Sequence, residues 1–137
     1  MQPRFCYNKR AQETLAAFVN GGRFPHALLL EGPEGSGRRT FAREIAAALF
    51  CRGEHKPCGS CSQCRKVLER NHPDVEYYGG DGSRRSFHID TIRQLRQNAW
   101  LLPGEAPCRV CVLCGAENMT DQAQNALLKI LEEPPEH

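Results

Sequence analysis

The sequence ALLLEGPEGSGRRTF, at residues 27–41, decides the fold. Its apolar run at residues 27–30 predicts a short buried strand. The glycine-rich segment 32–37 predicts a turn, and residues 38–50 predict a helix that begins where the turn ends. This order is the context of a phosphate-binding loop, because consecutive backbone N–H groups and the positive end of the helix then face one concavity.

This turn departs from the phosphate-loop signature G-x-x-x-x-G-K-[ST] at the two positions that carry its chemistry. Arginines replace both the lysine and the hydroxyl residue that follows it. The threonine comes one residue late, about 100° further round the helix, so its hydroxyl should miss a magnesium ion. The candidate nucleotide-binding residues of this degenerate loop are Gly32, Gly35, Gly37, Arg38, Arg39 and Thr40. A glycine-rich turn that never meets ATP is an equally open alternative.

The composition predicts one globular domain of ordinary character. The chain has 137 residues, of which 40% are hydrophobic and 25% are charged. Its net charge of +2 makes no electrostatic case for nucleic acid. Residues 1–10 lack the apolar core of a signal peptide, and no apolar run approaches the roughly 20 residues of a membrane span. We expect a cytoplasmic protein with no membrane partner.

Apolar periodicity predicts helices and strands in alternation along the chain. The expected helices are residues 9–20, 38–50, 61–70, 90–101 and 120–133, and the further strands are 75–78 and 109–114. Asp90 and Thr120 are the expected N-caps of the last two helices, and Leu127, Ile130 and Leu131 should face inward. The alternation predicts an α/β fold with a small parallel sheet of three buried strands.

Eight cysteines are many for a chain of this length, and without a signal peptide their close spacing favours metal over disulfides. Cys51, Cys58, Cys61 and Cys64 supply four thiolates within fourteen residues, which is a ligand set of tetrahedral zinc. The set leaves no open coordination position, so we expect the zinc to be structural. His55 is an alternative to Cys51 as fourth ligand, and redox-active or idle cysteines are the other alternative.

Three further cysteines repeat the C-x2-C spacing but do not indicate a metal site. Cys111 and Cys114 fall on the expected strand 109–114 and Cys108 directly precedes it, and successive side chains of a strand alternate between the two faces. Cys111 should therefore point away from the other two, so we expect small core residues there and no second metal site. Cys6 stands alone and supports no prediction.

The end of that strand lacks the acidic residue with which a hydrolysing phosphate-loop enzyme holds magnesium. Cys114 and Gly115 occupy the position, and Glu117 follows too late to reach it without a distorted loop. Because both this carboxylate and the loop lysine are missing, the sequence predicts a protein that keeps the fold but does not hydrolyse nucleotide. The alternative is an ATPase in which Arg38 and Glu117 substitute for the missing groups.

Several motifs occur here in one specific order. The apolar run led by His26 and the glycine-rich loop are followed by the four-cysteine insert, a His-Pro-Asp turn at residues 72–74 and the sequence NALLKILEEPP at 125–135. In this order the chain resembles the bacterial DNA polymerase III clamp-loader subunits, and the likeness extends over residues 24–135.

The resemblance implies an AAA+ fold. Residues 1–137 would form the N-terminal part of an AAA+ module, with a parallel sheet, flanking helices and a zinc-binding insert at residues 51–64. In the family another strand lies between the first and third strands, and an arginine in a later Ser-Arg-Cys motif serves a neighbouring ATPase. Neither is in this sequence, so the resemblance implies a truncated piece with an incomplete sheet, which puts its independent stability in question.

Within the family, gamma/tau subunits keep the loop lysine and the acidic strand end, and delta-prime subunits typically lack both. Arg38, Arg39, Cys114 and Gly115 therefore resemble the delta-prime branch. The implied function is that of a non-hydrolysing structural subunit that helps to load the sliding clamp onto primed DNA. The implied partners are the gamma/tau and delta subunits and, through the complex, the sliding clamp and primed DNA.

Two further alternatives concern function. One is an ATP-hydrolysing, gamma/tau-like subunit with a variant loop, and the other is a nucleic-acid-binding module that depends on zinc. Arg84 and Arg85, in the loop at residues 79–85, could contact a phosphate backbone. Two charges make a weak patch, so a solvated loop tip is the favoured interpretation.

Overall fold

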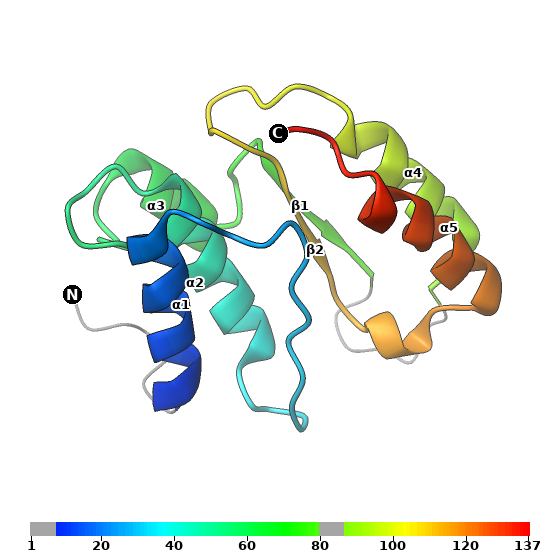
Figure 1. Cartoon of the computed structure of the whole chain (residues 1–137), viewed down its shortest axis with the longest axis horizontal. Helices are drawn as coiled ribbons and strands as arrows, with labels where there is room; N and C mark the ends of the chain where they lie inside the picture. Colours follow the sequence, from blue (N-terminus) through cyan, green and yellow to red (C-terminus); the bar gives the residue numbers. More distant parts are fainter. Residues whose placement is uncertain (1–7, 80–86) are drawn as a thin grey trace. The chain divides into compact units, whose positions relative to one another are not determined.

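The computed structural model describes residues 8–79 and 87–137, and it divides the chain into two compact units (Figure 1). The first unit, Met1–His72, holds helices α1 (Lys9–Gly21), α2 (Arg38–Phe50) and α3 (Ser62–Leu68). The second unit, Pro73–His137, holds β1 (Val75–Tyr78), α4 (Ile89–Ala99), β2 (Val110–Leu113), the 3-10 helix η1 (Ala116–Asn118) and α5 (Asp121–Glu132). Each unit has a hydrophobic core.

The core of the first unit forms where α1 lies beside α2 (Figure 1). Asn8 caps α1 by accepting a 3.0 Å hydrogen bond from the N–H of Ala11. Leu15, Phe41 and Ala48 are buried between the helices. Partly buried side chains packed against them are Ala11, Val19, Phe24, Leu30 and Ile45. Both helices have nearly the predicted bounds, because each carries an apolar stripe that the other covers.

The expected strand at residues 27–30 is not formed, and that prediction is wrong. The segment has no regular secondary structure, and Leu29 is 84% exposed. Only Leu30 of this run packs against the core of the first unit. A strand needs a partner for its backbone N–H and C=O groups, and within the described residues the sheet pairs β1 with β2 alone. The sheet therefore has two strands there, not the expected three.

The second unit is built on the parallel pair of β1 and β2. The register places Val75 opposite Val110 and Tyr78 opposite Leu113. Helices α4 and α5 lie side by side over the sheet (Figure 1). The buried core between these helices and the sheet consists of Tyr78, Phe87, Ile92, Leu95, Met119 and Ala123. The expected α/β class with a small parallel sheet is confirmed.

One of the two predicted helix caps is confirmed and the other is wrong. The hydroxyl of Thr120 accepts a 3.2 Å hydrogen bond from the N–H of Ala123 at the start of α5. Helix α4 begins one residue earlier than predicted, so its N-cap position is His88. Asp90 lies in the first turn instead, where its carboxylate pairs with Arg93 at 3.0 Å.

Strand β2 is half-buried along its whole length, whereas the sequence predicted a buried strand. Cys111 and Leu113 pack against the core under α4 and α5, and Val110 and Val112 alternate to the other face of the sheet. The inward stripe of α5 is also narrower than predicted. Leu127 and Ile130 pack against the core, but Leu131 is 37% exposed.

A buried carboxylate fixes the loop between α4 and β2. Asp74 accepts hydrogen bonds from three consecutive backbone N–H groups, those of Gly104 at 2.7 Å and of Glu105 and Ala106 at 2.8 Å. The guanidinium of Arg109 lies 3.8 Å from the same carboxylate. Because Asp74 is 1% exposed, these donors replace the water that its charge would otherwise need.

Gly79 is required where the two strands end. Its φ is +91°, and a Cβ at this position would overlap the carbonyl oxygen of Cys114. The N–H of Cys114 donates a 2.8 Å hydrogen bond to the carbonyl of Tyr78. The end of β2 is thereby held close against the end of β1.

The prediction on Arg84 and Arg85 of the loop at residues 79–85 falls outside the described residues, as does Cys6. Among the helices of the described ranges, none combines the length and the apolar character needed to cross a bilayer.

Candidate metal centre and degenerate phosphate loop

The four cysteines of the insert converge in the first unit. Cys51 directly follows α2, Cys61 is the N-cap of α3, and Cys64 lies in the first turn of α3. Cys58 lies in the intervening loop. All four Sγ atoms lie within 4.8 Å of one another. The end of one helix and the start of the next therefore carry three of the four sulfurs.

Backbone N–H groups surround these sulfurs. The N–H groups of Gly53 and Cys58 each lie 3.3 Å from Sγ of Cys51. The N–H of Cys61 donates to Sγ of Cys58 at 3.3 Å, and that of Cys64 donates to Sγ of Cys61 at 3.4 Å. Donors of this kind stabilise the thiolate form, which is the form that binds a metal.

Hydrogen bonds lower the pKa values of two cysteines in the cluster, and burial raises the pKa of a third. The N–H of Cys61, and then the hydroxyl and N–H of Ser60, lower the pKa of the half-buried Cys58 thiol to about 5. Burial acts to raise the pKa of Cys61, but hydrogen bonds from the backbone of Cys64 and Arg52 lower it overall. Burial raises the pKa of Cys64. Cys58 is thus ready to act as a thiolate at neutral pH.

The loop passes close to the sulfurs at Gly53. A Cβ on Gly53 would lie 3.1 Å from Cβ of Cys58 and 3.3 Å from its Sγ. The residue types predict a bend here, but this close approach of Gly53 to Cys58 has no signal in the sequence. We infer that Gly53 lets the loop close over the cluster.

The arrangement fits one metal ion with four sulfur ligands. Zn–S bonds of about 2.3 Å in a tetrahedron place the sulfurs about 3.8 Å apart, and Sγ of Cys58 lies 4.0 Å from Sγ of Cys64. Within the described residues, the cluster that could hold a metal comprises the four cysteines without His55. His55 is exposed, so the geometry gives no support to it as an alternative ligand.

The other cysteines of the described ranges belong to the second unit. Cys108, Cys111 and Cys114 belong to no metal-binding group that the described residues form. Burial raises the pKa of Cys111 to about 11 and also raises that of Cys108. Cys111 packs against the core of the second unit, as its predicted role as a small core residue requires.

The glycine-rich loop of the first unit has the backbone that its sequence predicts. Gly35 and Gly37 have φ values of +78° and +82°, and Gly37 is the N-cap of α2. A Cβ on Gly32 would lie 2.8 Å from the hydroxyl oxygen of Ser36, so only glycine fits there without a shift. The six candidate residues therefore lie in this turn and the first turn of α2. Whether they contact a nucleotide stays a prediction.

The hydroxyl of Thr40 is already engaged within α2. Its oxygen accepts a 3.5 Å hydrogen bond from the guanidinium of Arg43. Arg43 lies one helical turn further along α2. That Thr40 is out of position for magnesium stays a prediction.

In the second unit, no carboxylate occupies the position at which β2 ends. Cys114 follows the strand and Gly115 turns the chain with a φ of +78°. Glu117 comes next, exposed, on the 3-10 helix η1. The carboxyl end of the strand therefore has a thiol and a glycine where a hydrolytic site would have an acid.

These features define an α/β protein with a small parallel sheet and a four-cysteine cluster that could hold a metal ion. A family model described as "DNA polymerase III, delta subunit" matches residues 7–137. The chain therefore belongs to this family. The expected resemblance to bacterial DNA polymerase III subunits is confirmed.

Known relatives carry two different subunit names. The chain is 38% identical to DNA polymerase III subunit delta' of Yersinia pestis over 117 residues, which are 84% of this chain and 34% of that protein. It is 33% identical to subunit delta' of Bacillus subtilis (strain 168) over 127 residues, 91% of this chain and 38% of that one. It is 34% identical to subunit gamma/tau of Mycobacterium tuberculosis (strain ATCC 25618 / H37Rv) over 125 residues, 90% of this chain and 22% of that one.

The chain thus spans between about a fifth and two fifths of the length of these relatives. Identity alone does not separate the two kinds of subunit. The choice between the two kinds of subunit therefore depends on the residues of the glycine-rich loop and of the end of β2.

Proposed function

We propose that this chain is part of a non-hydrolysing, delta-prime-like subunit of the DNA polymerase III clamp loader. The observation that carries the proposal is the end of β2, where Cys114 and Gly115 stand in place of a magnesium-binding acid. Magnesium bridges the phosphates of the transferred group in nucleotide hydrolysis, and a thiol on a strand end does not replace a hard oxygen ligand for it.

The loop supports the same conclusion independently. Arg38 occupies the place of the phosphate-binding lysine, and its planar guanidinium is a different group from a compact ammonium. The hydroxyl oxygen of Thr40 accepts a hydrogen bond from the guanidinium of Arg43 within α2. A turn of this shape can still attract phosphate through the N–H groups of the helix start, so binding of ATP without hydrolysis is compatible with the proposal.

The proposed partners are the gamma/tau and delta subunits and, through the assembled complex, the sliding clamp and primed DNA. The support is the family and the names of the relatives. We further propose a structural zinc ion in the four-cysteine cluster and a cytoplasmic location. In this account the zinc stabilises the insert and takes no part in a reaction.

Steady-state ATP hydrolysis by the purified chain tests the proposal against the ATPase alternative. We expect no magnesium-dependent phosphate release by the wild-type chain or by Arg38→Ala. Arg65→Ala, an exposed arginine of α3 outside the loop, is the matched control. Turnover that Arg38→Ala abolishes and Arg65→Ala preserves would reverse the conclusion in favour of a variant ATPase.

A further inference from the structure

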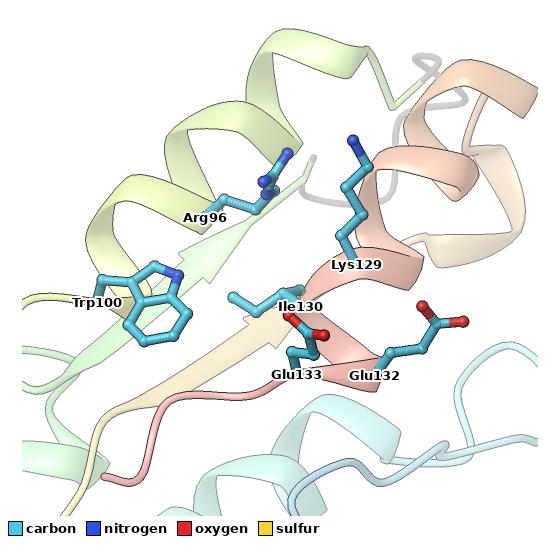
Figure 2. Close-up of a pocket in the computed structure, with 6 residues that line it drawn as sticks. All are labelled: Arg96, Trp100, Lys129, Ile130, Glu132 and Glu133. Carbon is cyan, nitrogen blue, oxygen red and sulfur yellow. The ribbon is translucent and has the colours of Figure 1, made fainter.

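A hollow of about 250 Å³ lies in the second unit, and its lining comes from α4, from Trp100 that follows α4, and from α5 (Figure 2). The lining residues are Arg96, Trp100, Lys129, Ile130, Glu132 and Glu133, which include charged groups but no sulfur. Reversible oxidation of protein side chains is the chemistry of sulfur. The cluster in the first unit, in contrast, brings four sulfur atoms together.

The four cysteines of this cluster form a buried pair and a half-buried pair. Cys51 and Cys64 are 4% and 0% exposed, whereas Cys58 and Cys61 are half-buried. Sγ of Cys58 also lies 3.6 Å from the hydroxyl of Ser60, a residue that is exposed. A small oxidant that arrives from solvent therefore reaches the half-buried pair before the buried pair.

The half-buried pair has the spacing of a reversible dithiol. The sequence CGSC at residues 58–61 is a C-x2-C step directly before α3, and Cys61 is the N-cap of that helix. The N–H of Cys61 donates to Sγ of Cys58 at 3.3 Å, and the two sulfurs lie within 4.8 Å of each other. A C-x2-C pair at the start of a helix is the arrangement on which many thiol–disulfide oxidoreductases depend.

The buried pair belongs to two different helices. Cys51 directly follows α2, and Cys64 lies in the first turn of α3. A metal ion held by all four sulfurs therefore links the end of α2 to the start of α3. If the half-buried pair stops acting as ligands, two sulfurs remain, and two do not complete the tetrahedral shell of structural zinc. The link between the two helices then depends on the state of Cys58 and Cys61.

We propose that the four-cysteine centre is a peroxide-sensitive switch, in which Cys58 and Cys61 form a disulfide and the metal ion is released. This inference rests on the structural zinc of the proposed function. Sγ of Cys58 attacks one oxygen of hydrogen peroxide, the O–O bond breaks, and hydroxide leaves while the sulfur becomes a sulfenic acid. Sγ of Cys61 then attacks the sulfur of Cys58 and displaces a second hydroxide. Each hydroxide takes a proton to become water, and the two sulfurs together lose the two electrons that the peroxide gains.

The switch is reversible in both its covalent and its metal-binding step. A dithiol reductant restores the two thiols by exchange, after which the four sulfurs can bind zinc again. Because the free energy of binding structural zinc also stabilises the fold, oxidation should lower the thermal stability of the first unit. Reduction in the presence of zinc should restore it.

Peroxide titration of the zinc-loaded 137-residue chain tests this proposal, after elemental analysis of its zinc content. A chromophoric chelator follows zinc release. Iodoacetamide under denaturing conditions, then reduction and N-ethylmaleimide, marks the oxidised cysteines for peptide mass spectrometry. We expect about one zinc released for each peroxide consumed, because one disulfide empties one site. Within the cluster, N-ethylmaleimide should label Cys58 and Cys61 only, and dithiothreitol with added zinc should restore the original zinc content.

Cys111→Ser, in the core of the second unit, is the matched control and should release zinc as the wild type does. Protein that carries no zinc before oxidation contradicts the proposed structural zinc and the switch together. Protein that carries zinc and keeps it in a large excess of peroxide overturns the switch alone. A disulfide that includes Cys51 or Cys64 overturns the assigned pair, and oxidation that dithiothreitol does not reverse overturns the switch.

Discussion

Nε2 of His72 lies 2.5 Å from Oε1 of Gln63, and both residues are buried in the first unit. Gln63 lies on α3 between two of the clustered cysteines, so this contact fixes the helix that carries Cys64. The His72 ring also packs against Phe50, with 4.7 Å between ring centroids, at the end of α2 that leads into Cys51. One imidazole thus braces both helices that deliver sulfurs to the cluster.

Replacement of this imidazole should weaken the first unit and its metal centre together. His72→Ala leaves the buried amide of Gln63 unpaired, which should cost about 1–3 kcal/mol of unfolding free energy. We also expect about a tenfold loss of zinc affinity, because groups that orient ligand-bearing elements affect the metal at that level. Thermal unfolding and competition with a chromophoric chelator measure the two effects.

The control for that variant is His55→Ala, which removes an exposed imidazole from the insert. Neither the thermal midpoint nor the zinc affinity should change. A loss of zinc in His55→Ala would contradict the four-cysteine ligand set and restore histidine as a ligand.

The cluster should bind about one zinc ion per chain, because four thiolates complete a tetrahedral shell. Cys58→Ser replaces one sulfur with a weaker ligand and should reduce the zinc content to well below one. Cys111→Ser, a cysteine of the second core, should keep the ion. Elemental analysis of protein purified without chelators measures both. Wild-type protein that carries no zinc would remove the structural role proposed for the insert.

Alkylation of the metal-free chain should distinguish the cysteines by their pKa values. The thiolate is the reactive form, and it predominates above the pKa. Because the pKa of Cys58 is lowered to about 5, this residue should react at neutral pH and slow only as the pH falls through that value. The pKa of Cys111 is raised to about 11, so its reaction should accelerate only in strong alkali. Peptide mass spectrometry after iodoacetamide treatment follows each cysteine, and equal rates at neutral pH would contradict this assignment.

Asp74→Asn should destabilise the second unit. The amide nitrogen of asparagine is a donor, so it cannot accept the N–H groups that the second carboxylate oxygen now receives from Glu105 and Ala106. We expect a loss of about 2–3 kcal/mol in unfolding free energy, as for a buried donor left without a partner. Asp90→Asn, at an exposed position on α4, is the control and should change stability by less than about 0.5 kcal/mol. Equal stability of the two variants in urea unfolding would show that the Asp74 clamp is unimportant.

Local signals predicted most of the helices and the four cysteines that the structure brings together. The apolar stripe of α2 and the N-cap Thr120 of α5 are short-range patterns, and the structure agrees with both. The C-x2-C spacing brings sulfurs together within one loop and one helical turn, so the convergence of the four cysteines could also be predicted.

These local signals could not predict contacts between residues that are distant in the sequence. Residues 27–30 are as apolar as a buried strand, but a strand depends on a backbone partner from a distant part of the chain. Asp74 and the N–H groups of residues 104–106 are about thirty residues apart in the sequence, and no periodicity connects them. The braces formed by His72 were missed for the same reason, although the His-Pro-Asp turn was a visible motif.

Single-turnover phosphate release, with the zinc-loaded chain in excess over Mg·ATP, shows whether the loop can hydrolyse ATP at all. Under these conditions even very slow hydrolysis at the loop becomes visible, whatever the rate of product release. We expect a rate equal to that of a protein-free control, because in the proposed function Arg38 and Cys114 stand where a hydrolysing subunit would hold phosphate and magnesium. Phosphate release by the wild-type chain that disappears in Arg38→Ala would contradict it.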